Sequence, residues 1–195
     1  MKLLLVRHGE TDWNKKLRYQ GWRDIPLNPT GLEQARLAAE ALKAYAPVAL
    51  FASSLTRTMQ TAEIIGKAIG LSPQSDQRLK EIRFGEWEGR TYPEVLELFP
   101  QEVRMWRECP LQAQVPGGET LKQVLERMLE ALKEICSAAE GNVVVVTHGG
   151  PIRLLLCHIG AEGAMWQYSV KPGSITIIEN EGGKMTLLGQ KNGQK

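Results

Sequence analysis

Two short apolar runs, far apart in the chain, constrain the fold more than any other feature of the sequence. The runs 3–6 and 143–146 contain nothing but Leu and Val, the pattern of strands that are buried on both faces of a sheet. Each run is followed by one polar residue, a histidine and a glycine: Arg7-His8-Gly9 and Thr147-His148-Gly149. Because parallel strands end at the same edge of a sheet, where α/β folds place their ligand crevices, the sequence predicts two imidazoles at one edge.

Stretches with the apolar spacing of helices separate these strands. Such spacing follows Thr30, Ser53-Ser54 and Thr120; Thr30 with Glu33 and Thr120 with Gln123 match capping boxes, and the two serines are expected to cap their helix. Further helices are predicted near 92–99, 101–107 and 151–159, further strands at 48–52, 174–179 and 184–188, and a loop over 12–29. Strands that alternate with helices predict an α/β fold, a three-layer α/β/α sandwich with a mostly parallel central sheet.

The size and charge of the chain limit the classes of protein to which it can belong. Its 195 residues suit a single domain, which we expect to cover 1–195 with a frayed tail over 190–195. The 24 basic and 22 acidic residues give a net charge of +2, which is too close to neutral for a dedicated nucleic-acid binder. No apolar run approaches the roughly 20 residues that span a bilayer, and the start lacks a signal-peptide pattern. We therefore expect no nucleic-acid or membrane partner.

The three cysteines indicate a reducing compartment. Cys109, Cys136 and Cys157 leave an odd thiol and form no Cys-x-x-Cys pair. We expect Cys136 and Cys157 to be core thiols and the protein to be cytoplasmic. The sequence leaves the oligomeric state open, a homodimer included.

Few residues remain that can carry chemistry. The three aspartates form no Asp-x-Asp pair, the three histidines make a poor metal site, and neither a Gly-x-Ser-x-Gly elbow nor a Gly-x-x-x-x-Gly-Lys loop is present. The simpler alternative for each remaining residue is a loop histidine or a solvated surface charge. Glu86 and Glu88 lie near Glu81 in sequence. The candidates are Arg7, His8, Arg57, Glu81 and His148.

These residues suit the transfer of a phosphoryl group. A neutral imidazole is a competent nucleophile toward phosphorus. Arg7, Arg57 and a protonated His148 would spread positive charge over the phosphoryl oxygens. Arg57 is expected in the first turn of a helix, where free amides also favour anions. Glu81 would give a proton to the leaving alkoxide if its pKa is raised.

The segment Arg7-His8-Gly9-Glu10-Thr11 resembles the signature of the histidine phosphatase superfamily, which is also called the phosphoglycerate mutase-like family. The resemblance implies a phosphoglycerate mutase-like fold and an enzyme that works on a small phosphate monoester without a metal or a cofactor. The similarity covers nearly the whole chain through motifs in a fixed order: Gln20-Gly21-Trp22-x-Asp24-x-Pro26-Leu27, Ser54-x-x-Arg57-Thr58-x-Gln60-Thr61-Ala62, Glu81-x-x-Phe84-Gly85-x-Trp87-Glu88-Gly89, Pro116-Gly117-Gly118-Glu119 and Val146-Thr147-His148-Gly149.

The same resemblance implies roles for individual residues. His8 would become phosphorylated and Glu81 would act as the acid and base. Arg7, Arg57 and His148 would complete the phosphate pocket, and Asn14 would add a polar contact. Gln20, Gly21 and Gly149 are further candidates for contact with the phosphate or the substrate, with packing inside the loop as the alternative for Gln20 and Gly21.

The compact span between Glu81 and His148 favours a phosphatase, because dedicated mutases of this family carry an insertion there. The amino-acid sequences of 84–89 and 173–176 are most similar to those of bacterial α-ribazole phosphatases, which remove a 5′-phosphate during cobalamin nucleotide-loop assembly. α-Ribazole 5′-phosphate is therefore the best single guess. A broad-specificity or sugar-phosphate phosphatase, a 2,3-bisphosphoglycerate-dependent phosphoglycerate mutase and a non-catalytic phosphate-binding module stay open. Aromatic residues predicted at the rim would stack on a heteroaromatic substrate or pack under the loops: Trp13, Trp22, Trp87, Tyr92 and Trp106.

Overall fold

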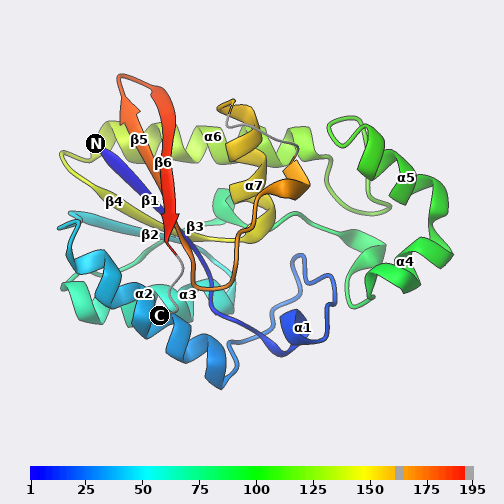
Figure 1. Cartoon of the computed structure of the whole chain (residues 1–195), viewed down its shortest axis with the longest axis horizontal. Helices are drawn as coiled ribbons and strands as arrows, with labels where there is room; N and C mark the ends of the chain where they lie inside the picture. The colour runs from blue at the N-terminus through cyan, green and yellow to red at the C-terminus, as the bar shows by residue number, and fades with distance from the viewer. Residues whose placement is uncertain (161–164, 192–195) are drawn as a thin grey trace.

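Six strands form one sheet within residues 1–160 and 165–191, the part of the chain that the computed structural model describes (Figure 1). The first four strands in sheet order run parallel, whereas the last two add an antiparallel hairpin. The predicted α/β fold with a mostly parallel sheet is confirmed. In sheet order the strands are β3 (Gln74–Asp76), β2 (Ala49–Ser53), β4 (Val143–Thr147), β1 (Lys2–Arg7), β5 (Ile175–Glu181) and β6 (Lys184–Lys191).

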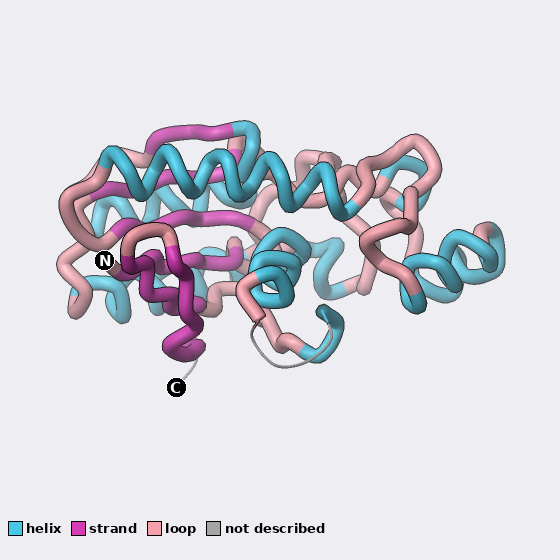
Figure 2. Tube along the Cα trace, turned by 90° about the horizontal axis from the view of Figure 1, so that it is seen from above, coloured by secondary structure: helices cyan, strands magenta, loops and turns pink. Residues whose placement is uncertain are grey.

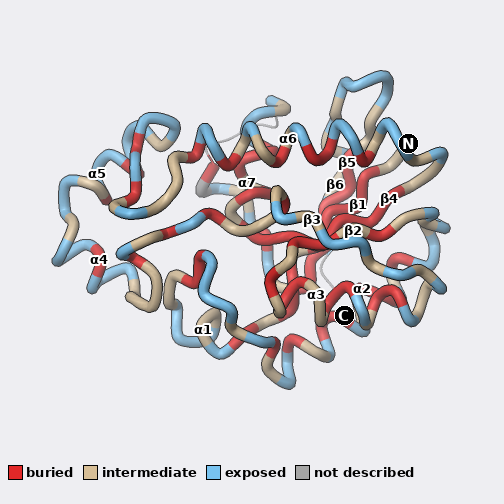
Figure 3. The backbone as a smooth tube through the Cα atoms, turned by 180° about the vertical axis from the view of Figure 1, so that it is seen from behind, coloured by how far each residue is buried: buried red, intermediate tan, exposed pale blue. Residues whose placement is uncertain are grey.

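Helices pack on both faces of this sheet and produce three layers (Figure 2). Alternate residues of a strand point to opposite faces, so Leu4 and Val6 pack with α2 and α3, whereas Leu3 and Leu5 pack with α6 and α7. All four side chains are fully buried, which is why the run contains no polar residue. Figure 3 shows buried residues concentrated in the strands and on the helix faces that cover them. The covering helices are α2 (Pro29–Lys43), α3 (Thr56–Ile69), α6 (Leu121–Ala138) and α7 (Gly149–His158).

A smaller group of elements extends past one end of the sheet (Figure 1). Trp87 and Trp106 are 1% and 5% exposed, and their ring centroids lie 5.5 Å apart. These two aromatics therefore form a local core and do not line a rim, whereas Trp22 and Tyr92 are exposed and Trp13 is half-buried. The elements are α1 (Asp12–Lys15), α4 (Tyr92–Leu98), α5 (Pro100–Glu108) and the 3₁₀ helices η2 (Gly85–Trp87) and η3 (Met165–Gln167). A further 3₁₀ helix, η1 (Gln77–Leu79), follows β3 and packs Leu79 into the core of the sheet.

The register of the central strands sets the position of the two predicted imidazoles. Arg7 lies opposite Thr147 in the parallel pair of β1 and β4, and the amide of His8 donates a 3.0 Å hydrogen bond to the carbonyl of Thr147. His8 and His148 therefore leave adjacent strands at the same edge, as predicted. Ser53 ends β2, the neighbour of β4 on its other side, and reaches this edge as well.

The beginnings of two helices differ from the prediction. α2 begins at Pro29 with Asn28 as its N-cap, because the Asn28 side chain accepts from the amide of Gly31 and Pro29 needs no hydrogen-bond acceptor, so the predicted Thr30–Glu33 box is wrong. α3 has Leu55 at its N-cap without a side-chain hydrogen bond. The two preceding serines therefore do not cap α3. The third predicted start, the capping box of Thr120 and Gln123 on α6, is confirmed.

Two further expectations need correction. Cys157 is exposed, because the buried part of α7 ends at Leu156, and Cys136 is half-buried beside the core. Gln190 and Lys191 belong to β6, where they pair with β5, so the predicted frayed tail does not begin at 190. The remainder of that predicted tail, 192–195, lies outside the described residues. Across the described ranges, no helix is both long enough and apolar enough to cross a membrane.

Candidate active site

His8 is buried at the end of β1 with one ring nitrogen tied to the backbone. Its Nδ1 lies 2.7 Å from the carbonyl oxygen of Gly9. A carbonyl oxygen only accepts, so Nδ1 carries a proton, and the lone pair of a neutral ring lies on Nε2. Burial, followed by the positive charges of Arg57 and Arg7, holds the pKa of His8 well below its ordinary value. At neutral pH the side chain is therefore an uncharged imidazole with Nε2 as its nucleophilic atom.

His148 lies beside His8 at the N-cap of α7. The two ring centroids are 5.1 Å apart with 63° between the ring planes. The Nε2 atom of His148 lies 2.8 Å from the hydroxyl of Ser53, in a fully buried contact. Burial, Arg57 and His8 lower the pKa of His148 well below its ordinary value, so the expected protonated form is not the one that the protein alone favours.

Two arginines supply the positive charge of the site. Arg57, in the first turn of α3, is fully buried and donates from its Nη atoms to the carbonyls of Arg23 and Gly21, at 2.9 and 2.8 Å. Arg7 donates from Nη1 to the carbonyl of Val170 at 2.6 Å. Burial lowers the pKa of each arginine to about 10, which leaves both charged at neutral pH.

Three buried nitrogens of this site have no hydrogen-bond partner among the described residues: Arg7 Nε, Arg57 Nε and His148 Nδ1. Buried polar atoms are normally paired, because an unpaired one costs roughly 1–3 kcal/mol. Backbone carbonyls accept hydrogen bonds from Nη atoms of both guanidinium groups, whereas the two Nε atoms have no partner among the described residues. The two charged guanidinium nitrogens suit the oxygens of a phosphate.

Glu81 lies on the same side of the sheet, in the irregular segment between η1 and η2. Its Oε1 accepts from the amide of Ile82 at 3.0 Å and lies against Gly150, where a Cβ atom would collide with it. Burial lowers the pKa of Arg7, Arg57 and Arg153, and the negative charge of Glu81 opposes that lowering in each of them. The structure thus brings Glu81 together with the histidines and arginines that the sequence singled out.

The other predicted contact residues have partners inside the loop. The Oδ1 of Asn14 accepts from the amide and the hydroxyl of Thr11, and the Oε1 of Gln20 accepts from the same hydroxyl at 2.9 Å. The carbonyl of Gly21 is one of the two groups that hold Arg57. These contacts pack the amide oxygens of Asn14 and Gln20 inside the loop and give Gly21 a supporting role for Arg57, whereas contact of Asn14 or Gln20 with a ligand stays a prediction.

Gly149 opens α7 directly beside the cationic groups. A Cβ atom there would lie 3.0 Å from Nη1 of Arg153 and 3.3 Å from Nε of Arg7. Arg153 was not singled out in the sequence, although it stands one helical turn after Gly149 and so shares its helix face. Ser53 was also missed as a site residue, because a serine just before a helix usually caps it; its place at the end of β2 was the available signal.

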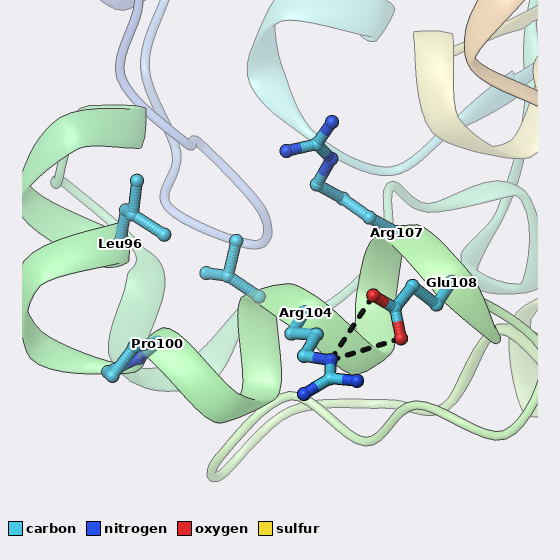
Figure 4. A pocket seen from close by; sticks show the side chains of 6 residues that line it. Leu96, Pro100, Arg104, Arg107 and Glu108 are labelled. Atoms are coloured by element: carbon cyan, nitrogen blue, oxygen red, sulfur yellow. Dashed lines mark hydrogen bonds and ion pairs between the residues drawn. The ribbon is translucent and has the colours of Figure 1, made fainter.

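The described residues contain no group of three or more His, Cys, Asp or Glu side chains that could hold a metal ion. A separate pocket of about 360 Å³ lies along α4 and α5, where Arg104 forms an ion pair with Glu108 (Figure 4). None of the predicted site residues lines it. The lining residues are Leu96, Pro100, Val103, Arg104, Arg107 and Glu108.

Comparison with known proteins agrees with this geometry. The profile of the histidine phosphatase superfamily (branch 1) matches residues 3–193. Phosphoserine phosphatase 1 of Hydrogenobacter thermophilus is 35% identical over 191 residues, which cover 96% of this chain and 90% of that protein. The "Probable phosphoglycerate mutase GpmB" of Serratia proteamaculans is 37% identical over 154 residues, 76% of this chain and 70% of that protein.

A solved structure from Escherichia coli K-12, of a protein assigned as an alpha-ribazole-5′-P phosphatase, superimposes with a TM-score of 0.84 at 27% identity. The superposition covers 96% of this chain and 94% of that one. The profile match alone spans nearly the whole sequence, through both strand-end histidines. This chain belongs to the histidine phosphatase superfamily.

Proposed function

We propose that the protein is a phosphomonoesterase that works through a phosphohistidine on His8. One observation carries the proposal: an uncharged His8, with its lone pair on Nε2, shares its site with Arg7 and Arg57, whose buried Nε atoms have no hydrogen-bond partner within the described residues. The family consists of phosphatases and mutases, and a nucleophile flanked by cationic donors fits the first step of either reaction.

In the first half-reaction, the Nε2 atom of His8 forms a bond to phosphorus while the bond from phosphorus to the ester oxygen breaks. Glu81 gives its proton to the leaving alkoxide, so the product departs as a neutral alcohol. Arg7 and Arg57 donate to the phosphoryl oxygens as negative charge builds up on them. A phosphate dianion beside His148 would raise the pKa of that ring, opposing burial and Arg57, and would let it donate as well.

In the second half-reaction, the oxygen of a water molecule forms a bond to phosphorus and the bond from phosphorus to Nε2 breaks. The carboxylate of Glu81 takes the proton of that water and is thereby ready for the next cycle. Inorganic phosphate leaves, and His8 returns to its uncharged form. A mutase would return the phosphoryl group to a second hydroxyl of the substrate, and a binding module would stop before the first bond breaks.

Two substrate classes have support at the rim of the site. α-Ribazole 5′-phosphate is supported by the similarity to the E. coli structure and by Trp22, an aromatic side chain that is 37% exposed. However, Lys80 and Arg83 already lie 4.6 and 5.6 Å from the centroid of the Trp22 ring. These cations favour a substrate with a second anionic group, and phosphoserine and phosphoglycerate, named in the two relatives, both carry a carboxylate.

The test is a comparison of kcat/KM on purified protein for α-ribazole 5′-phosphate, O-phosphoserine and O-phosphoethanolamine. The last two differ by one carboxylate, so their ratio measures what the cations contribute. A preference for α-ribazole 5′-phosphate by several orders of magnitude would assign the protein to cobalamin assembly. A preference for phosphoserine would assign it to phosphorylated carboxylic acids, and the absence of hydrolysis on every ester would refute the phosphomonoesterase. Turnover that depends on added 2,3-bisphosphoglycerate would identify the protein as a mutase.

A further inference from the structure

One side chain of α6, that of Arg127, binds the backbone of the segment that carries Glu81. Arg127 donates from Nη1 to the carbonyls of Arg78 and Lys80, at 2.6 and 2.7 Å, and from Nη2 to the carbonyl of Glu81 itself, at 2.8 Å. Arg78 lies within the short 3₁₀ helix η1, whereas Lys80 and Glu81 lie between η1 and η2, outside any strand or helix. A single guanidinium group therefore satisfies three carbonyls around the proposed acid.

Glu119 holds Arg127 in that orientation. Its two oxygens accept from Nε and Nη2 of Arg127, both at 2.9 Å, in a bidentate pair in which the side chains are 17% and 16% exposed. Glu119 also accepts from the amide of Arg83 and donates its own amide to the Arg83 carbonyl, each at 2.9 Å. The indole of Trp22 also donates to the carbonyl of Glu81, at 2.8 Å, so this one oxygen accepts from both Arg127 and Trp22.

We propose that Arg127, oriented by Glu119, is the positioning residue that holds Glu81 at the leaving-group oxygen. The proposal rests on the role of Glu81 as the acid in the proposed function. Its hydrogen bonds act on Glu81 through the backbone of Arg78, Lys80 and Glu81, whereas its positive charge, after burial, Arg57 and His8, also lowers the pKa of His148, an effect that Arg127→Lys retains. A shift of about 1 Å in a catalytic group costs on the order of 100-fold in rate, so a loosened segment should impair proton donation before it impairs phosphate binding.

The test uses two esters of similar size with different leaving groups, benzyl phosphate and 4-nitrophenyl phosphate. The benzyl alkoxide needs a proton as it leaves, whereas 4-nitrophenolate does not, so the ratio of their kcat/KM values reports proton donation. We expect Arg127→Met to lower this ratio by about 10-fold or more. Arg127→Lys, which keeps the charge but loses the planar fork, should give a smaller loss, because an ammonium cannot serve three carbonyls and a bidentate carboxylate together.

A double variant separates positioning from a general loss of structure. If Arg127 acts through Glu81, Arg127→Met combined with Glu81→Gln should lower the ratio no further than Glu81→Gln does alone. Losses that multiply, or an equal loss on both esters in Arg127→Met, would overturn the proposal. If the Met variant does not fold, the Lys variant and Glu119→Gln are measured in the same way and decide the question by the same ratio.

Arg104→Met is the matched control, because Arg104 also pairs with a glutamate but does so on the exposed surface of α5. It should leave the ratio unchanged. Failure of the proposed function looks different from failure of this inference. If the wild-type protein forms no phosphohistidine and cleaves neither ester, the function is refuted; if it does both and the variants keep the wild-type ratio, only the positioning role is refuted.

Discussion

Ser53 offers a sharp test of the role of His148, because the adjacent residue, Ser54, is also a serine and provides a matched control variant. The Ser53 hydroxyl is fully buried and lies 2.8 Å from Nε2 of His148. Ser53→Ala removes this contact without adding volume. Ser54→Ala makes the same chemical change at a half-buried residue of the same turn. The Ser53 hydroxyl also accepts from the amide of Leu55 at 3.5 Å, so the loss of kcat/KM, rather than the loss of stability, reports its bond to the imidazole.

The size of the effect follows from the charge of His148. In the free protein the ring is uncharged, and a neutral hydrogen bond contributes about 1 kcal/mol. If His148 becomes charged as it donates to the phosphoryl oxygens, its bond to Ser53 strengthens to roughly 1.5–3 kcal/mol. Only the difference, about 0.5–2 kcal/mol, affects the transition state, which corresponds to a loss of roughly 2–30-fold in kcat/KM.

Steady-state kinetics on 4-nitrophenyl phosphate and a thermal melt together check this reasoning. Ser53→Ala should lose roughly 2–30-fold in kcat/KM, and its stability should fall by about 1 kcal/mol, which lowers Tm by about 2–4 °C in a domain of this size. Ser54→Ala should match the wild-type protein in both. A Ser53→Ala variant with wild-type kcat/KM, or a Ser54→Ala variant with the same loss, would refute the charged role of His148.

Three further predictions concern the site as a whole. His8→Ala should abolish turnover and the acid-labile phosphoenzyme together, as measured by product release and by phosphate labelling; surviving turnover would mean that another residue is the nucleophile. Stability should fall below about pH 6.5, because the lowered pKa values of His8 and His148 let the unfolded chain bind protons more readily than the folded one. Urea melts at pH 7.5 and 5.5 should differ by about 2–3 kcal/mol, and equal melts would contradict the buried, uncharged rings. EDTA should leave kcat/KM unchanged, and strong inhibition would reveal a metal requirement.

The strands and the two histidines were predictable because their signals are local. An unbroken apolar run indicates a strand buried on both faces, and parallel strands deliver their last residues to one edge. His8 and His148 could therefore be placed together although 140 residues separate them. The last two strands, predicted at 174–179 and 184–188, also have local signals, and the structure pairs them as the antiparallel hairpin of β5 and β6.

The residues that support the site were not predictable, because their partners are distant in sequence. Serine is a residue type that commonly caps helices, and the contact of Ser53 with His148 spans 95 residues of sequence. Arg127 lies on the polar side of an amphipathic helix, where an exposed charge is the usual outcome, and its carbonyl partners are 46–49 residues away. Hydrophobic periodicity predicts which side of a helix is buried, but it does not predict which polar groups of distant segments the helix will contact.

The most direct measurement is the identity of the phosphorylated atom. The protein is mixed with a ³²P-labelled monoester, quenched after milliseconds, digested and analysed by mass spectrometry, and the isomer of phosphohistidine is assigned by ³¹P NMR. The hydrogen bond from Nδ1 to Gly9 predicts label on His8, at Nε2. Label at Nδ1 of His8, label on His148 or turnover without any phosphoenzyme would contradict the proposed mechanism.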